Sequence, residues 1–567
     1  MRLISLITLL LLCTTKIGFA HNATTKNRVA TPPPCLNGSY TIGVGGDYAT
    51  FTLAADDLNS QGVCGPVVFN IISGVYNEEL ALTDLTGTSA ANTITFQSQS
   101  GNPADVILQS AGFTDVVLLD NADFITIKDL TISYTGTGAN SAIQLQDDAD
   151  FVTITNCVLN GGSSTSTANA HALIYANESI LANQCDNFTL ENSTLNGAAN
   201  GVYFANSSAN NTGSSIIGNN FTNQFRKGSY LDEFDAIEVV DNTFSNGSNA
   251  NSSYTAITLN DCNNASQVLR NQIASTYIKY GIVLDGEGGT AGNEVLVANN
   301  FIAMGGAEPF NQAQGIRIAG CSFVNIYFNN VSNYNTYNTA ITSCLFISGT
   351  ITDGTVNVVN NILSMTGGGN AQVAVSLFST NNRADIGISN YNNYYAPSPS
   401  SIAYSSGDLD LAGYQSLLLN DANSISIDPE FTSATDLHVS ALGLQGAGTT
   451  IATITTDIDG DTRATPPAIG ADEASSPITG LAEVANHFSM YATPNNTIVV
   501  KTTDAETLTG TIQITDMAGR MVLTDAITIA NGMGYLQTAG LSNGIYAITF
   551  VSADGNRAAS EKVVFNR

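Results

Sequence analysis

Short stretches of alternating apolar and polar residues recur through the middle of the chain, each followed by Asn or Asp and then another apolar residue. FITIKDLTI begins at Phe124, FVTITNCVL at Phe151 and FTLENSTL at Phe188. An alternation of period two puts every second side chain on one face, so each stretch predicts a β-strand with its Ile, Val, Leu and Phe turned inward. Such short strands cannot bury that face alone, so neighbouring units must stack.

The polar position that ends each strand recurs every 22 to 36 residues between about residues 120 and 395. It falls at Asp129, Asn156, Asn192, Asn219, Asp241, Asn271, Asn299, Asn329, Asn360 and Asn390. Asn tolerates left-handed backbone geometry, and its amide can bond to the next Asn in a stack. The repeat therefore predicts an all-β solenoid held in register by a ladder of Asn side chains. Leucine-rich repeats are the rival solenoid, but their Leu spacing and helical half-repeats are absent.

Residues 38–473 resemble the pectin-lyase-like superfamily, which implies a right-handed parallel β-helix. The segment from Tyr40, YTIGVGGDYATFTLAADDLNSQG, resembles that superfamily's N-terminal capping unit, and GVYNEE from Gly74 resembles its first coil. Within the capping unit, four apolar residues share one face of a predicted helix: Phe51, Ala54, Ala55 and Leu58. We expect this helix to plug the end of the solenoid, which would otherwise expose core and strand edges.

The segments IDPEF, from Ile427, and TTDIDGDTRATPPAIGADE, from Thr455, resemble a closing segment of secreted bacterial β-helix proteins. Its aspartates Asp457, Asp459 and Asp461 alternate as they do in calcium-binding loops. No Glu follows at the twelfth position, so the loop is not an EF-hand. A calcium site and a tight polar turn both remain open, and calcium is the one cofactor considered.

Residues 474–487 have the composition of a linker, and residues 488–567 change to alternating strands separated by turns, which predicts a small β-sandwich. This last segment resembles the C-terminal sorting domain of type IX secretion substrates. The matching residues are Asp516, Gly519, Arg520, Gly544, Ile545, Tyr546 and Lys562. The resemblance implies that the type IX secretion machinery exports the chain across the outer membrane. One departure is that Tyr491 is followed by Ala-Thr-Pro-Asn-Asn instead of the usual Pro-Asn-Pro.

Residues 1–20 are predicted to be a signal peptide, followed by an extension over 21–37. Arg2 precedes an apolar run over residues 3–13, and small residues lie near Ala20. The run is too short to cross a bilayer, and no other stretch predicts a membrane span. The sequence thus predicts a secreted or cell-surface protein.

Composition narrows the choice of partners. The chain carries 47 acidic and 17 basic residues, with a net charge of −30. Nucleic-acid binding needs clustered Lys and Arg, so this class of partner is excluded. Seven cysteines remain after residue 20, without a CxxC pair, and an exported chain can form disulfides. Cys35 and Cys64 flank one short unit and are the pair we expect to be joined.

The superfamily includes polysaccharide lyases, hydrolases and esterases, but the catalytic motifs expected of them are missing from this chain. The strongest candidates for a groove with chemistry are Asp232, Glu233 and Asp235, which follow the basic pair Arg226–Lys227. Two carboxylates at a suitable separation can hydrolyse a glycosidic bond. The second candidates are Asp285 and Glu287. Solvated acidic turns are the alternative for both sets.

A glycan-binding role needs fewer special residues than an enzyme. A long β-helix presents an elongated face suited to polymers, and Tyr rings can stack on sugars. Tyr334 and Tyr337 lie in one segment between strands, although packing between coils explains them equally well. The sequence favours a glycan-binding or adhesin-like surface protein with a polysaccharide as candidate ligand. A polysaccharide lyase or glycoside hydrolase is the first alternative, and a structural surface-layer protein is the second.

Overall fold

The chain divides into two compact units, Met1–Asp472 and Glu473–Arg567. The structure is a computed structural model. It describes residues 35–110, 112, 115–136, 138–177, 185–205, 211–246, 251, 253–286, 288–305, 312–335, 342–367, 372–377, 382–396, 402–405, 407–473, 488–493, 497–502, 507–516, 520–538, 541–553 and 558–565. The predicted signal peptide and the linker over 474–487 therefore lie outside the described residues.

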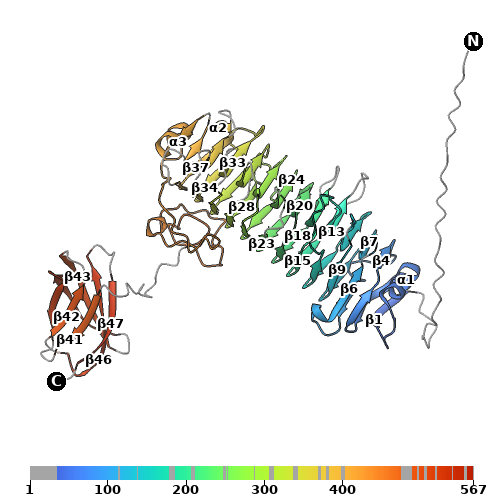
Figure 1. Cartoon of the computed structure of the whole chain (residues 1–567), viewed down its shortest axis with the longest axis horizontal. Helices are drawn as coiled ribbons and strands as arrows, with labels where there is room; N and C mark the ends of the chain where they lie inside the picture. The colour runs from blue at the N-terminus through green and yellow to red at the C-terminus, as the bar shows by residue number, and fades with distance from the viewer. Residues whose placement is uncertain are drawn as a thin grey trace, which may run out of the picture. The chain divides into compact units, whose positions relative to one another are not determined.

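The first unit is a parallel β-solenoid, which confirms the predicted fold (Figure 1). Successive strands visit three sheets in turn, here named A, B and C, with 13, 12 and 13 strands among the described residues. Neighbouring strands pair in parallel through almost the whole stack, the exception being β39 with β40.

Sheet A consists of β1 (Leu36–Ile42), β2 (Val63–Ile71), β5 (Ile94–Ser98), β8 (Ile125–Lys128), β11 (Thr153–Thr155), β14 (Thr189–Glu191), β18 (Ser215–Ile217), β22 (Glu238–Val240), β25 (Gln267–Leu269), β28 (Val295–Ala298), β31 (Val324–Tyr327), β34 (Val356–Val359) and β37 (Ile386–Asn390). Sheet B consists of β3 (Gly74–Asn77), β6 (Val106–Ser110), β9 (Thr131–Tyr134), β12 (Val158–Asn160), β15 (Thr194–Asn196), β19 (Asn220–Thr222), β23 (Thr243–Asn246), β26 (Gln272–Ser275), β29 (Phe301–Met304), β32 (Asn330–Asn333), β35 (Ile362–Met365) and β38 (Asn393–Tyr395).

Sheet C consists of β4 (Leu80–Thr83), β7 (Val117–Asp120), β10 (Ile143–Gln146), β13 (Ala172–Asn177), β16 (Asn200–Ala205), β20 (Lys227–Asp232), β24 (Thr255–Asn260), β27 (Tyr280–Asp285), β30 (Gln314–Ala319), β33 (Thr342–Ser348), β36 (Gln372–Leu377), β39 (Ala403–Tyr404) and β40 (Asp408–Leu409). A further pair, β17 (Asn211–Thr212) and β21 (Phe234–Asp235), lies outside these sheets. The inward side chains of all three sheets form one continuous apolar core.

A ladder of Asn side chains runs through the turns between sheets A and B. In each step the backbone N–H and the amide of one Asn donate to the side-chain oxygen of the next, at 2.9–3.1 Å. The members are Asn219, Asn242, Asn271, Asn300, Asn329, Asn361 and Asn392. All are buried, so the ladder satisfies polar groups that would otherwise be costly inside the solenoid.

The predicted ladder residues are partly wrong, because the left-handed backbone and the ladder hydrogen bonds belong to two neighbouring residues. The residue just before each ladder Asn takes the left-handed conformation, as at Asp241, Asn299 and Asn360. The ladder amide comes from the next residue, for example Asn300 after Asn299. A single Asn per turn does not serve both purposes.

Helix α1 (Phe51–Gln61) covers the N-terminal end of the solenoid (Figure 1). Its buried residues include the predicted Phe51, Ala54, Ala55 and Leu58. The Thr50 side chain caps the helix by accepting from the Leu53 N–H. The sulfurs of Cys35 and Cys64 are joined, and this disulfide links the start of β1 to β2.

At the other end lie α2 (Asn382–Asp385) and α3 (Leu411–Leu418) (Figure 1). The buried Tyr414 of α3 packs edge-on against Tyr394, with ring centres 5.5 Å apart. The predicted closing segment does not lie across this end. It folds back along the side of the solenoid, where its backbone bonds to the side chains of Asn299, Asn330 and Asn360. Short 3-10 helices occur at Pro103–Asp105 and Leu442–Leu444.

The second unit has two antiparallel sheets around its own apolar core, as the sequence predicts. One sheet contains β41 (Phe488–Ala492), β42 (Thr497–Thr502) and β45 (Met533–Gln537). The other contains β43 (Leu508–Asp516), β44 (Met521–Ile529), β46 (Gly544–Ser552) and β47 (Ala558–Phe565). Across the described parts of both units, no helix is long and apolar enough to span a membrane.

Candidate functional site

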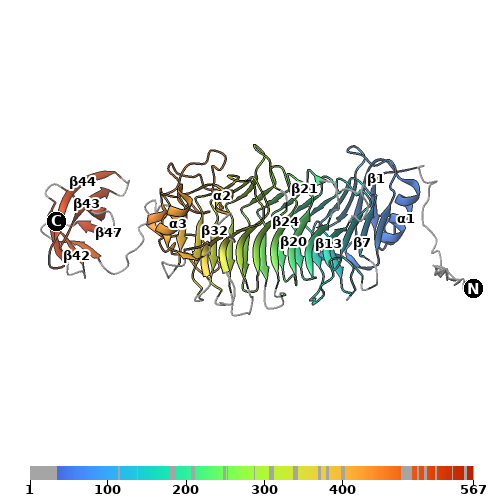
Figure 2. The same cartoon turned by 90° about the horizontal axis from the view of Figure 1, so that it is seen from above.

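The outward side chains of sheet C form one column along the solenoid, because the strands pair in register. Figure 2 shows β7, β13, β20 and β24 of this sheet along the stack. From coil to coil the column reads Leu118, Gln144, Tyr175, Tyr203, Tyr230, Thr258, Val283, Arg317, Phe346, Ser376 and Tyr404. Two small side chains, Thr258 and Val283, thus lie between the large side chains of Tyr230 and Arg317.

This drop in side-chain size contributes to a hollow of about 390 Å³ on the outer face of β20, β24, β27 and β30. Thr258 and Val283 lie at its floor, and both are largely buried. One edge of the hollow consists of Lys227, Thr255 and Tyr280, which pair in register across successive coils. The other edge consists of Asn260 and Asp285, which also pair in register. The hollow therefore has cations on one edge and a carboxylate on the other.

Lys227 is the half-buried cation of this edge. Its ammonium lies 4.2 Å from the centre of the Tyr230 ring. The pKa of Lys227 is lowered to about 8, mainly by burial and also by the nearby Arg226, while Asp232 and Asp285 oppose the change. Among the described residues no hydrogen bond or ion pair reaches the ammonium.

The two arginines of the hollow are held in different ways. Arg226 donates to the Thr167 carbonyl at 2.5 Å and to the Asn169 side chain at 2.9 Å, so it fastens a neighbouring turn. Arg317 lies over the rings of Tyr280 and Phe346, at 5.4 and 5.5 Å from their centres. Such cation–π contacts orient the guanidinium without using up its hydrogen-bond donors.

The acidic side of the hollow includes one predicted candidate, Asp285, which lines it directly. Asp232 lies on the same edge, two coils earlier, and its carboxylate accepts from the Asn260 amide at 2.6 Å. Burial raises the pKa of Asp232, and the nearby Asp261 raises this pKa further. The Asp232 carboxylate is therefore fixed by a hydrogen bond at the acidic edge of the hollow.

The remaining predicted acidic residues do not converge on the hollow. Asp235 belongs to β21 at the next corner of the coil, where it accepts from Asn264 at 3.2 Å. Glu233 has a left-handed backbone between β20 and β21. Glu287 lies outside the described residues. The sequence grouped Asp232, Glu233 and Asp235 because they lie within four positions of one another, but the chain turns a corner of the solenoid between β20 and β21 and separates them.

The Tyr residues of the column stack on one another. Ring centres of Tyr175 and Tyr203 are 6.1 Å apart, and those of Tyr203 and Tyr230 are 4.6 Å apart with planes 15° from parallel. Tyr203 occupies one face of Tyr230, which leaves the opposite face for Lys227. The Tyr203 and Tyr230 rings therefore cover one another's faces, and their edges and hydroxyl groups remain for other contacts.

The predicted ligand residue Tyr334 packs between coils. Its backbone N–H donates to the Met304 carbonyl at 2.8 Å, and its ring lies where a side chain on Gly305 would be, 2.2 Å from that Cβ position. Tyr337 lies outside the described residues. The Tyr residues of sheet C were missed, and only the register between coils could have aligned them.

A second hollow, of about 400 Å³, lies between sheet A and the closing segment. Its cation Arg270 is already paired with Asp241, at 2.7 and 2.9 Å. Its Tyr327 hydroxyl donates to Asn325 at 2.9 Å. These groups satisfy one another, so this hollow offers fewer free contacts to a ligand than the hollow of sheet C.

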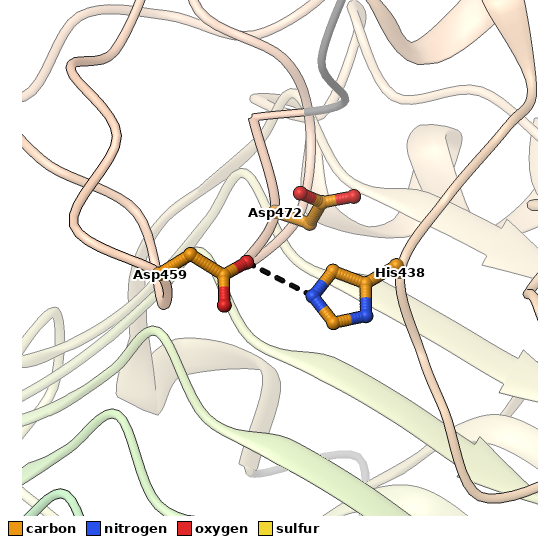
Figure 3. Close-up of side chains that lie close together, drawn as sticks. All are labelled: His438, Asp459 and Asp472. Atoms are coloured by element: carbon orange, nitrogen blue, oxygen red, sulfur yellow. Dashed lines mark hydrogen bonds and ion pairs between the residues drawn. The ribbon is translucent and has the colours of Figure 1, made fainter.

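The closing segment holds a cluster of one imidazole and two carboxylates, from His438, Asp459 and Asp472 (Figure 3). One ligand atom from each lies within 4.8 Å of the others. Of the three residues predicted for calcium, only Asp459 belongs to this cluster. Asp457 instead accepts from the backbone N–H groups of Asp459 and Asp461, at 3.0 and 2.8 Å, as in a capped polar turn.

In the C-terminal unit, the predicted sorting residues support the sandwich. Arg520 donates to Asp516 at 3.1 Å across the turn between β43 and β44. Gly544 leaves room for the Tyr546 ring, whose hydroxyl donates to the Ser542 carbonyl at 3.1 Å. The remaining residues are Ile545, which pairs with Val564, and Lys562, which pairs with Ala547, while Gly519 lies outside the described residues.

Residues 489–566 match the family model of the secretion system C-terminal sorting domain. This finding confirms the predicted type IX sorting domain. The chain is thus a parallel β-solenoid protein that the type IX secretion machinery exports to the cell surface. No curated protein matches the sequence.

The chain has low similarity to several solved structures. A tailspike protein, gp49 from Acinetobacter baumannii bacteriophage Fri1, a capsular polysaccharide depolymerase, is 10% identical, with 95% of this chain and 81% of that chain covered and a TM-score of 0.28. The Agl-KA catalytic domain is 13% identical, with 65% and 60% covered and a TM-score of 0.21. A pectin methylesterase from Aspergillus niger is 13% identical, with 70% and 96% covered and a TM-score of 0.20.

Proposed function

We propose that this exported solenoid is a glycan-binding protein whose binding site is the hollow on sheet C. One observation carries the proposal: the hollow contains polar groups that lack a partner in the protein. The Thr258 hydroxyl is buried at its floor and has no hydrogen-bond partner among the described residues. Leaving a buried hydroxyl unpaired is costly, and a ligand hydroxyl would remove that cost.

The surrounding groups suit a sugar. Lys227 and Arg317 supply donors, Asp285 supplies acceptors and Asn260 supplies both, so neighbouring sugar hydroxyls can be bound as donors and acceptors. The hollow has the size of a small-molecule site, so it can hold one or a few sugar units. Export to the cell surface brings this face into contact with extracellular polysaccharides.

A second candidate function rests on the acidic edge. Asp232 and Asp285 are two coils apart in register, which is about 10 Å at the usual spacing between strands. That separation is near the upper limit for two carboxylates that hydrolyse a glycosidic bond with inversion. A glycoside hydrolase is therefore the alternative that the same experiment must test.

The test is affinity electrophoresis of the purified protein through gels containing neutral and acidic polysaccharides, with reducing ends and unsaturated uronates measured in parallel. We expect retention by at least one polymer without product. Lys227→Met should reduce retention by about tenfold in affinity, because one charged contact is worth about 1.5 kcal/mol or more. Lys128→Met, on sheet A, is the matched control. Product from any polymer would make the protein an enzyme, and equal retention of all three proteins would remove the hollow from the binding site.

A further inference from the structure

The cluster of His438, Asp459 and Asp472 joins three segments of the chain that have little regular secondary structure (Figure 3). The Nε2 atom of His438 lies 2.9 Å from a carboxylate oxygen of Asp459. The Asp472 carboxylate faces the same point from the end of the solenoid unit. One nitrogen and two carboxylate ligands therefore converge from positions 21 and 34 residues beyond His438.

The solenoid fixes each of these positions by packing. The residue before each ligand is apolar and contacts Phe301 and Ala303 of β29 in a small core separate from the main one. These three residues are Leu437, Ile458 and Ala471, and all are buried. The ligands are thus held by a rigid support, as a preorganised metal site requires.

The outer contacts also match those of a metal site. The other ring nitrogen of His438, Nδ1, is hydrogen-bonded to Asp436. Ligand histidines commonly make such a bond to a carboxylate, which orients the ring and leaves Nε2 for the ion. Asp472 accepts from the Val439 N–H at 2.9 Å, which helps to fix the position of its carboxylate.

The charge of the cluster points to a cation. Asp436, Asp459 and Asp472 surround one imidazole, so the group carries negative charge even when the ring is protonated. The Arg463 guanidinium donates to Asn299 and to the Ala471 carbonyl, and lies 3.7 Å from the centre of the Phe328 ring.

We infer that His438, Asp459 and Asp472 bind one divalent transition-metal ion, with Zn²⁺ as the best fit, and that Asp436 positions the histidine. A set of one imidazole and two carboxylates suits zinc, whereas calcium and magnesium prefer oxygen ligands throughout. The ion would fasten the closing segment to the side of the solenoid next to the linker. The rival account is a protonated His438 bound only by the same carboxylates.

The experiment uses the full exported chain, stripped with a chelator and dialysed against Zn²⁺, Mn²⁺ or Ca²⁺. Retained metal is counted, and thermal unfolding is followed with and without Zn²⁺. We expect one equivalent of Zn²⁺ and an increase of several degrees in melting temperature. His438→Ala and Asp472→Asn should abolish both effects, Asp436→Asn should weaken binding by 10–100-fold, and the surface variant Asp353→Asn should match the parent.

Three results would overturn the inference. The first is no retained Zn²⁺ in the parent protein. The second is equal retention in His438→Ala, provided that its circular dichroism shows a folded solenoid. The third is retention of Ca²⁺ alone that depends on Asp457 and Asp461, because this would place the ion in the neighbouring turn. If His438→Ala does not fold, loss of affinity in Asp436→Asn, where the three ligands remain, decides the question.

Discussion

The ammonium of Lys227 lies 4.2 Å from the centre of the Tyr230 ring, on the face that Tyr203 leaves uncovered. This relationship joins the stacked Tyr residues to the hollow and places a cation at its edge. A cation held by an aromatic ring keeps its hydrogen-bond donors for a ligand. The arrangement depends on the register of sheet C, which brings β16, β20 and β24 side by side.

The low pKa of Lys227 predicts a pH dependence of binding. Burial lowers this pKa to about 8, so the side chain is mostly charged at pH 7 and mostly neutral at pH 9. Affinity for an acidic polysaccharide should therefore fall severalfold between these values at constant ionic strength. Titration calorimetry at both pH values measures the change. If the affinity of Lys227→Met fell by the same factor between pH 7 and pH 9, another group would be responsible for the pH dependence.

The buried Asn ladder predicts a large loss of stability on truncation. Asn300→Ala removes the acceptor of the Asn271 N–H and amide and the donor to Asn329. Groups left unpaired in the interior cost about 1–3 kcal/mol each, so we expect a loss of about 3 kcal/mol or more in urea unfolding. Asn325→Ala is the control, since its side chain is partly exposed and accepts from Asn357 of the neighbouring coil and from Tyr327. Equal losses in the two variants would contradict the ladder's role.

Asp150 predicts that stability decreases as the pH rises through neutrality. Its pKa is raised to about 7, mainly by burial and also by the nearby carboxylates of Asp148, Asp186 and Asp123. Because the folded pKa lies above the unfolded value, the stabilisation is present at low pH and is lost as the pH rises through about 7. Asp150→Asn keeps an acceptor for the Asp186 N–H and should stabilise the protein at pH 8. The expected gain is on the order of 1 kcal/mol, discounted for partial exposure, with none at pH 4.

The burial of the cysteines predicts their reactivity in the protein without any substitution. Cys35 and Cys64 are joined, whereas Cys157, Cys185, Cys262, Cys321 and Cys344 are buried thiols. Burial raises the pKa of Cys157 to about 12, which makes the thiolate scarce. Alkylation of the folded exported protein should label no described cysteine, and five should react after unfolding without a reductant. Labelling of the folded protein would show that the coils open more readily than the packing implies.

The sorting domain predicts the fate of a truncated chain. A chain ending at residue 487 lacks the matched residues 489–566, so it should remain in the periplasm. Cell fractionation measures this, with the full chain as control. Arg520→Ala removes the side-chain contact to Asp516, which we expect to stabilise the turn of the sandwich. Export of this variant should therefore be reduced but not abolished. Complete loss of export would indicate that the secretion machinery recognises this turn directly.

The sequence predicted the solenoid because alternation and repeat length are local signals that survive insertions between strands. It could not separate the left-handed residue from the ladder residue, since Asn occupies both positions in pairs such as Asn299–Asn300 and Asn360–Asn361. The hollow on sheet C could not be predicted from the sequence either. Coils differ in length, so Tyr230, Thr258, Val283 and Arg317 have no fixed spacing until the register is known.

The metal cluster was missed for a related reason. Its ligands come from segments with almost no regular structure, and the alternation of Asp457, Asp459 and Asp461 drew attention to the turn instead. The side-chain bonds of Asn299, Asn330 and Asn360 fix where these segments lie. Those contacts join residues more than 80 positions apart, and no local pattern encodes them.

The most direct test of glycan binding in the hollow is to fill it without changing its charge. Val283 lies at the floor with its side chain outward, and Leu118 lies in the same column six coils away, outside the hollow. Calorimetry with a retained polysaccharide should show binding abolished or at least tenfold weaker in Val283→Trp and unchanged in Leu118→Trp. Unchanged affinity in a folded Val283→Trp would contradict the account.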